Sequence, residues 1–162
     1  MKHNSYRRYI LQLLLAVLVL ASCDSINCPL NSTVAAKYSF FDSNGKEFAI
    51  GDTLTVTAVG TDEMLVNRLV GQKGMTLPVS YYAPCDTLIF MLSDTLGLSA
   101  TDTIWIEKES TPHTDDPSCP IHIWHHVTSV RSTDNLIDTI IVVNPDINYD
   151  GGENFEIHFV TE

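Results

Sequence analysis

The sequence lacks the short motifs by which many hydrolases and nucleotide-binding enzymes are recognised. It contains no Gly-x-Ser-x-Gly elbow, no His-Glu-x-x-His pair, no glycine-rich phosphate loop and no Cys-x-x-Cys. Basic residues are also scarce, since nine Lys and Arg stand against twenty Asp and Glu, for a formal charge of −11. A chain this acidic repels nucleic acid and anionic headgroups. We predict that the protein is not an enzyme and does not bind nucleic acid.

Long hydrophobic runs are absent except for one near the N-terminus. The stretch from Ile10 to Leu20 is apolar apart from one glutamine, and it follows Lys2, Arg7 and Arg8. It is far shorter than the roughly 18 residues that cross a bilayer as a helix. Basic residues followed by a short apolar run are typical of a secretory signal peptide. Its removal takes away three positive charges and leaves a mature chain of charge −14.

The apolar run closes with Leu20-Ala21-Ser22-Cys23, which resembles the bacterial lipobox. In that motif the cysteine is acylated and becomes the first residue of the mature protein, so we predict lipidation of Cys23. The alternative is ordinary signal cleavage near Ala21. Each buried CH₂ contributes about 0.8 kcal/mol, so several acyl chains hold a domain at a bilayer without a spanning helix.

The sequence predicts a lipoprotein signal peptide over residues 1–22, a lipidated tether over 23–33 and one domain over 34–162. The mature length suits a single domain with a real core. No metal or organic cofactor is expected, calcium excepted.

Cysteines are few. Besides Cys23 the exported part has Cys28, Cys85 and Cys119, which allow at most one disulfide between them. Cys28 and Cys119 are each followed by proline, which favours pairing these two loop corners, while Cys28–Cys85 and Cys85–Cys119 stay open. On this interpretation Cys85 is a buried small hydrophobic residue.

Helical periodicity is scarce, and brief apolar runs alternate with Gly, Asp, Asn and Pro. Residues 53–58 alternate Thr with Leu54, Val56 and Ala58, as a half-buried strand requires. The regular spacing of short strands predicts an all-β fold, a single antiparallel β-sandwich, immunoglobulin-like or related. The other expected strands cover residues 38–42, 48–50, 86–92, 102–107, 121–130, 138–143 and 155–159.

Four local features sharpen this expectation. Asn44-Gly45 predicts a hairpin turn between residues 38–42 and 48–50. The run from Ile140 to Val143 has no polar side, so we expect that strand to be central and covered on both faces. Residues 64–70 also fit one or two helical turns, but the neighbouring strands favour a strand. Residues 110–120 are expected to form a loop.

The tripeptide Asp-Thr-Leu/Ile recurs at Asp52, Asp86, Asp94, Asp102 and Asp138. Its simplest interpretation is that aspartate ends a turn and the next two residues begin a strand. The tripeptide also resembles the acceptor for general O-glycosylation in exported proteins of Bacteroidota-type bacteria. The candidate acceptors are Thr53, Thr87, Thr95, Thr103 and Thr139.

A calcium loop is suggested by Asp146-x-Asn148-x-Asp150-Gly151. Alternating oxygen ligands with a glycine at the turn match the first half of such a loop, with Glu153 as a further ligand. The second half departs from the pattern, because Ile157 occupies the position of the bidentate glutamate. A polar hairpin loop explains the same residues.

Histidines cluster at His122, His125 and His126 around Trp124. In a strand, His122 and His126 share a face but lie about 13 Å apart, and His125 points the other way. No two of them form a local zinc chelate. We expect ordinary strand residues, with Trp124 packing or lining a surface groove; a metal would need partners such as His158.

Several segments together resemble a lipoprotein family of Bacteroidota, which we identify as the domain-of-unknown-function family 6452. The segments are Cys23, Cys28-Pro29-Leu30-Asn31, Asp52-Thr53-Leu54-Thr55, Leu77-Pro78-Val79-Ser80-Tyr81, Asp102-Thr103-Ile104-Trp105, Cys119, Val143-Asn144-Pro145 and Asn148-Tyr149. The resemblance implies an envelope location and no assigned activity. Asp24-Ser25-Ile26-Asn27 lacks the acidic run that resembles a surface-export tag, which favours the periplasmic face of the outer membrane.

These features favour a lipid-anchored envelope module that is non-catalytic and binds a protein or a glycan, or has a structural role. Trp105, Trp124 and the threonine-rich faces are candidate contact surfaces. The alternative is a calcium-dependent carbohydrate-binding or adhesin-like domain that uses residues 146–153. A hydrolase whose acids are dispersed over several strands is a third hypothesis.

Overall fold

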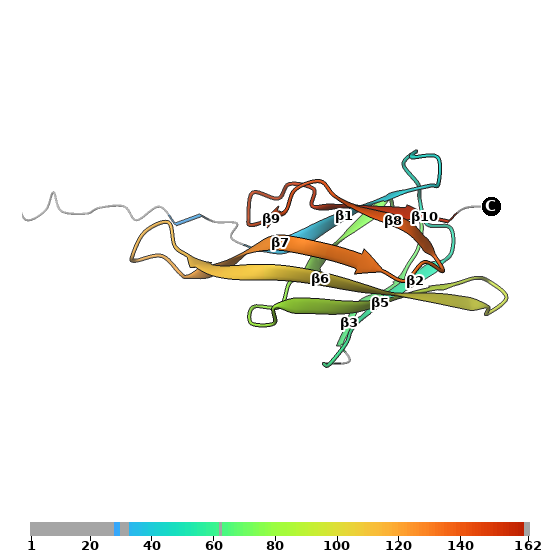
Figure 1. The fold of residues 1–162 in the computed structure, drawn as a ribbon, viewed down its shortest axis with the longest axis horizontal. Helices are drawn as coiled ribbons and strands as arrows, with labels where there is room; N and C mark the ends of the chain where they lie inside the picture. Colours follow the sequence, from blue (N-terminus) through green and yellow to red (C-terminus); the bar gives the residue numbers. More distant parts are fainter. Residues whose placement is uncertain (1–27, 30–32, 62, 161–162) are drawn as a thin grey trace, which may run out of the picture.

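The computed structural model describes residues 28–29, 33–61 and 63–160, which form an all-β fold (Figure 1). No helix among these residues is long and apolar enough to cross a bilayer. The predicted signal peptide and Cys23 lie outside the described residues. The strands are β1 (Ala35–Phe41), β2 (Thr53–Ala58), β3 (Glu63–Leu69), β4 (Gly74–Pro78), β5 (Cys85–Ser93), β6 (Ser99–His113), β7 (His122–Ser132), β8 (Ile137–Val142), β9 (Asp146–Ile147) and β10 (Phe155–Phe159).

The strands form two sheets that pack face to face, which confirms the predicted β-sandwich. The smaller sheet has the order β4-β1-β10-β8, and the larger has the order β3-β2-β5-β6-β7-β9. All pairings are antiparallel except β1 with β10, which run parallel with Tyr38 opposite Phe155.

The core lies between the sheets and follows from period-two alternation. In β1 and β10 every second residue is buried, including Tyr38, Phe40, Phe155 and Ile157. The Tyr38 and Phe155 rings stack at 4.8 Å. Inward side chains of β2, β5 and β6 complete the core from the larger sheet. Because apolar burial is the main stabilising term in folding, this layer holds the sandwich together.

Strand β4 was not predicted from the sequence. It pairs with β1, where a Cβ on Gly74 would lie 2.4 Å from the Tyr38 carbonyl oxygen. Only glycine permits so close a backbone approach. The very short strand β9, beside β7, was also missed. The ambiguous segment at residues 64–70 is a strand, β3, as expected.

The predicted hairpin at Asn44-Gly45 is only half right. Gly45 has φ of 76°, and the turn closes through a bridge between Phe41 and Glu47. However, residues 48–50 do not form a strand. There the chain crosses toward β2 in the other sheet, and the backbone of Ile50 bonds instead to Gly71 and Gln72.

The expected central position of residues 140–143 is wrong. Strand β8 is an edge strand of the smaller sheet, with β10 as its only sheet neighbour among the described strands. Ile140 and Val142 pack toward the core, whereas Ile141 is exposed. A run of apolar residues therefore did not require cover on both faces.

The loop expected at residues 110–120 is shorter than predicted, because β6 continues to His113. Pro112 is part of that strand and lies opposite Ile123 of β7. The pairing of β6 with β5 ends at Glu107, so beyond this point β6 pairs on one side only. An edge of this kind tolerates proline, which has no N–H to donate.

Candidate functional site

The two ends of the long axis carry different features. Cys28 and Cys119 form a disulfide with 5.6 Å between their Cα atoms, which confirms the favoured pairing and leaves Cys85 as a half-buried thiol. The bond joins the segment that precedes β1 to the connection between β6 and β7. At the opposite end of the molecule lies the turn of the β5–β6 hairpin (Figure 1). We call the end with the disulfide the tether end, after the tether predicted from the sequence, and the end with the β5–β6 turn the distal end.

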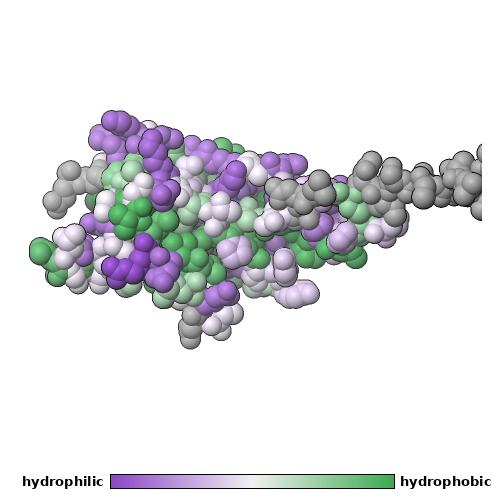
Figure 2. All heavy atoms as spheres, turned by 180° about the vertical axis from the view of Figure 1, so that it is seen from behind, coloured by the Kyte–Doolittle hydropathy of each residue, from purple (hydrophilic) through white to green (hydrophobic). Residues whose placement is uncertain are grey.

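The distal end presents two leucines to solvent. Leu96 is 85% exposed and Leu98 is 70% exposed. Both lie in the β5–β6 turn, where one carboxylate oxygen of Asp94 accepts hydrogen bonds from their backbone N–H groups at 2.8 and 2.9 Å. Gly97 supplies a positive φ of 84°. Figure 2 shows hydrophobic side chains at this extremity of the molecule. The turn is thus held in one conformation, although its apolar side chains contact little of the protein.

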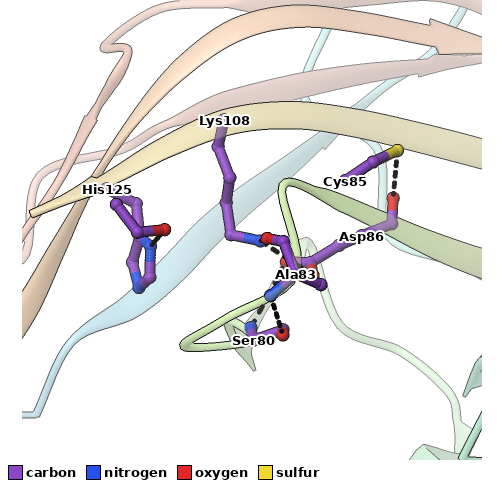
Figure 3. A network of polar contacts seen from close by, with 7 residues as sticks. Ser80, Ala83, Cys85, Asp86, Lys108 and His125 are labelled. Carbon is purple, nitrogen blue, oxygen red and sulfur yellow. Dashed lines mark hydrogen bonds and ion pairs between the residues drawn. The ribbon is translucent and has the colours of Figure 1, made fainter.

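A buried polar network lies between the sheets (Figure 3). Lys108, from the inner face of β6, has a fully buried side chain whose Nζ lies 2.9 Å from Oδ1 of Asp86 and donates to the Ala83 carbonyl at 2.7 Å. The other oxygen of Asp86 accepts from the N–H of Ser80 at 3.3 Å. Lys108 thus contacts the β4–β5 connection directly at Ala83 and, through Asp86, at Ser80, so the network fixes the conformation of residues 79–84.

His125 points into the sandwich from β7 near Lys108. Its Nδ1 lies 2.8 Å from the Ser110 hydroxyl, and its Nε2 is buried with no hydrogen-bond partner. Burial, aided by the positive charge of Lys108, lowers the pKa of His125 below its usual range, although Asp86 opposes this. The folded protein therefore favours the neutral form of the His125 imidazole. The pKa of Tyr38 is shifted in the opposite direction, because burial and, to a smaller extent, the charge of Asp86 raise it.

The residues fixed by this network separate two grooves. The larger, of about 810 Å³, lies at the tether end and is lined by Val34, Pro78, Tyr81, Tyr82, Ile121 and His122 among others. The smaller, of about 450 Å³, is lined by Val59, Leu65, Val79, Cys85 and Asp86 among others. In the larger groove three apolar side chains are strongly exposed: Tyr81 at 58%, Tyr82 at 92% and Ile121 at 68%.

An aromatic cluster covers the outer face of β6 and β7 near the tether end. His113 stacks on Trp124 at 3.5 Å, and Tyr149 lies edge-on to Trp124 at 5.5 Å. The Tyr149 hydroxyl donates to Asp115 at 2.5 Å, which lowers the pKa of Asp115 and raises that of Tyr149 to about 12. Trp124 also lines a small pocket of about 210 Å³. Its expected role in packing and in lining a surface pocket is confirmed.

The residues of the suggested calcium loop make contacts with protein groups. The Asp146 carboxylate accepts a hydrogen bond from Nδ1 of His126 at 2.6 Å, and Asn148 donates from its amide to Asp150 at 3.0 Å. One Glu153 oxygen is buried without a partner. Among the described residues there is no group of three or more His, Cys, Asp or Glu side chains arranged to hold a metal. Calcium binding by this loop remains a prediction.

The histidines lie as the strand geometry predicted. His125 is buried, while His126 is exposed on the other face of β7. His158 lies in the other sheet, where it stacks on Phe41 at 5.2 Å. Trp105, the other candidate contact residue, lies beneath Arg131, whose guanidinium carbon is 4.4 Å from the ring centroid. A cation–π contact of this kind covers one face of the indole.

The candidate glycosylation sites differ in exposure. Thr95, in the distal turn, and Thr139, in β8, are exposed. Thr53, Thr87 and Thr103 are half-buried within strands. Modification of any of them remains a prediction, and the exposed pair is the more accessible to an enzyme.

Three copies of the tripeptide have distinct structural roles that sequence reasoning did not separate. Asp94 bonds the turn ahead of it, as the simplest interpretation predicted, whereas Asp86 pairs with Lys108. Asp102 is buried and accepts hydrogen bonds from the connection between β7 and β8. The burial of Asp102 and Lys108 could have been predicted from the sequence, because both fall on the same alternating face of the strand as Ile104 and Ile106.

Comparison with protein-family models gives a match to a family of unknown function (DUF6452) over residues 53–159. The match covers more than half of the chain. Neither the curated proteins nor the solved structures contain a significant match.

Proposed function

This chain belongs to DUF6452, a family of unknown function, and we propose that it is a lipid-anchored, non-catalytic module of the cell envelope that binds a protein partner through its distal end. Anchoring is supported by the signal-like N-terminus with Cys23 and by a disulfide, which is typical of exported proteins. The proposed location is the outer membrane, facing the periplasm.

The observation that carries the binding proposal is the pair of leucines on the distal turn. A turn whose backbone is already fixed loses little backbone conformational entropy when a partner covers its exposed apolar side chains. A turn fixed by Asp94 and Gly97 meets that requirement. Its position opposite the disulfide places it at the end of the molecule farthest from the proposed anchor. A partner can therefore reach it without displacing lipid.

A photo-crosslinking amino acid at Leu96 in the full lipidated chain tests this proposal in intact cells. We expect a covalent adduct with a specific protein, and we expect the additional substitution Leu98→Ser in the same chain to abolish capture. A crosslinker at Val143, an exposed apolar residue of the β8 side, is the matched control and should give no adduct. Equal yields at positions 96 and 143, or none at either, would show that the distal end is not the binding surface.

Anchoring is tested separately. Replacing Cys23 with alanine should remove palmitate labelling and move the protein out of the membrane fraction. Unchanged labelling and fractionation would contradict anchoring through this residue.

A further inference from the structure

The tether-end groove has an apolar rim that the sandwich leaves uncovered. Tyr81 and Tyr82 project from the β4–β5 connection, and Ile121 projects from the residue that precedes β7. The two tyrosine rings lie edge to face at 6.4 Å. The described residues that line the groove include no Lys, Arg, Asp or Glu. The rim is therefore amphipathic without being charged, as the rings have hydroxyl groups at their tips.

The number of residues between Cys23 and Cys28 limits how far this rim can lie from lipid. Only five residue steps separate Cys23 from Cys28, and a fully extended chain spans at most about 18 Å over that length. Cys28 is bonded to Cys119, two residues before Ile121. The disulfide thus fastens the short tether directly beside the groove. Without it, the tether would reach to β1 and would leave the domain much more freedom.

We propose that the rim formed by Tyr81, Tyr82 and Ile121 docks onto the headgroup region of the membrane that holds the lipid anchor. This inference rests on the proposed lipidation of Cys23. Tyrosine suits that region, because its ring enters the apolar boundary while its hydroxyl stays among polar groups. The chain is acidic, and Asp115 and Asp116 lie in the adjacent loop, so neutral or zwitterionic headgroups fit better than anionic ones.

The buried network gives the rim its shape. Lys108 and Asp86 hold residues 79–84 from inside the sandwich, so Tyr81 and Tyr82 extend from a fixed connection. Docking would then orient the long axis away from the membrane and direct the distal leucines outward. In this arrangement the tether end contacts lipid, and the distal end is available to a protein partner.

Quenching by brominated lipid tests the docking. The mature lipidated protein is placed in phosphatidylcholine vesicles, with and without bromine on the acyl chains, as the variants Tyr82→Trp and Leu98→Trp. Both variants retain Trp105 and Trp124, so wild-type fluorescence is the common background. We expect the fluorescence added at position 82 to be largely lost in brominated vesicles and the fluorescence added at position 98 to be retained.

Mass spectrometry of the same samples distinguishes a failure of rim docking from a failure of lipid anchoring at Cys23. A lipidated protein whose added fluorescence at position 82 survives bromine would overturn docking and leave anchoring intact. A blue-shifted emission at position 82 without quenching would mean that a second copy or another protein covers the rim, which also overturns docking. A mass without acyl chains would overturn both, since the tether argument depends on lipid at Cys23.

Discussion

The substitution Asp102→Asn tests whether one buried carboxylate holds the connection between the two sheets. Asp102 is only 1% exposed. One of its oxygens accepts from the N–H groups of Leu136 and Ile137 at 2.7 and 2.8 Å. The other accepts from the Thr133 hydroxyl at 2.5 Å and from the backbone and side chain of Asn135 at 3.0 Å. The carboxylate therefore binds the whole β7–β8 crossover to β6.

The magnitude follows from the donors that asparagine leaves without an acceptor. The amide has the shape of the carboxylate, but its NH₂ group faces donors whichever way it is turned. At least two donors lose their partner, and each buried unsatisfied donor costs about 1 to 3 kcal/mol. We expect the free energy of unfolding to fall by about 4 kcal/mol, within the range that follows from two such losses.

Urea denaturation at neutral pH, followed by circular dichroism, measures this difference. The matched control is Asp94→Asn in another copy of the tripeptide, because the carbonyl of asparagine can accept the same two turn hydrogen bonds. That variant should stay within about 0.5 kcal/mol of wild type. If Asp102→Asn were equally mild, the crossover would not depend on the carboxylate and the reasoning would be refuted.

The pH dependence supplies a second check on the same residue. Burial alone raises the pKa of Asp102, but hydrogen bonds from Thr133 and from the N–H groups of residues 135–137 outweigh it and lower the pKa below the usual value. The unfolded carboxyl therefore takes up a proton first as the pH falls. The stabilisation is complete above about pH 4 to 5 and is lost as the pH falls through the lowered pKa. The difference between wild type and Asp102→Asn should narrow below about pH 4.

Three further outcomes follow from the interior and the disulfide. Lys108→Met should lower the free energy of unfolding by about 3 kcal/mol, because it leaves Asp86 without its buried partner, and Lys108→Met/Asp86→Leu should recover much of the loss in urea titrations. The double substitution Cys28→Ser/Cys119→Ser removes a bond between residues 91 positions apart and should cost about 4.6 kcal/mol in the chain-entropy model, which is measured as a lower melting temperature. A melting temperature that does not change when the wild-type protein is reduced would contradict this. The pKa of His125 is lowered in the folded protein, so the unfolded chain binds a proton at this residue first as the pH falls. The free energy of unfolding should therefore decline below about pH 6.5, and His125→Gln should lessen that decline. An NMR titration midpoint for His125 above that value would refute the lowered pKa.

Alternation in the sequence was sufficient for much of the fold. Thr53 to Ala58 and Phe155 to Phe159 predicted strands β2 and β10 because each side chain packs on a local period of two. The proline after each of two cysteines favoured the disulfide that the structure has, although it did not exclude the other two pairings. Membership of the family was also predicted from short segments distributed along the chain.

The errors arose where distant neighbours decide the outcome. Ile141 is exposed because it lies on the outer face of the smaller sheet, and no local pattern encodes whether a further layer covers that face or whether β8 is an edge strand. Pro112 lies within β6 because β5 ends before reaching it. The pair of Lys108 and Asp86 brings together two strands whose register was unknown, so the network at the β4–β5 connection could not be derived.

The parallel contact between the first and last strands bears on how the chain acquires its structure. Tyr38 meets Phe155 across almost the entire described sequence, and β10 separates β1 from β8. In a chain that is synthesised from its N-terminus, β1 therefore has an uncovered apolar face until β10 becomes available. Long-range pairings of this kind fold slowly and leave aggregation-prone surfaces in the meantime. A ribosome that stops short of Phe155 would release a chain that cannot complete its smaller sheet, and chaperones and proteases are the expected recipients of such a product.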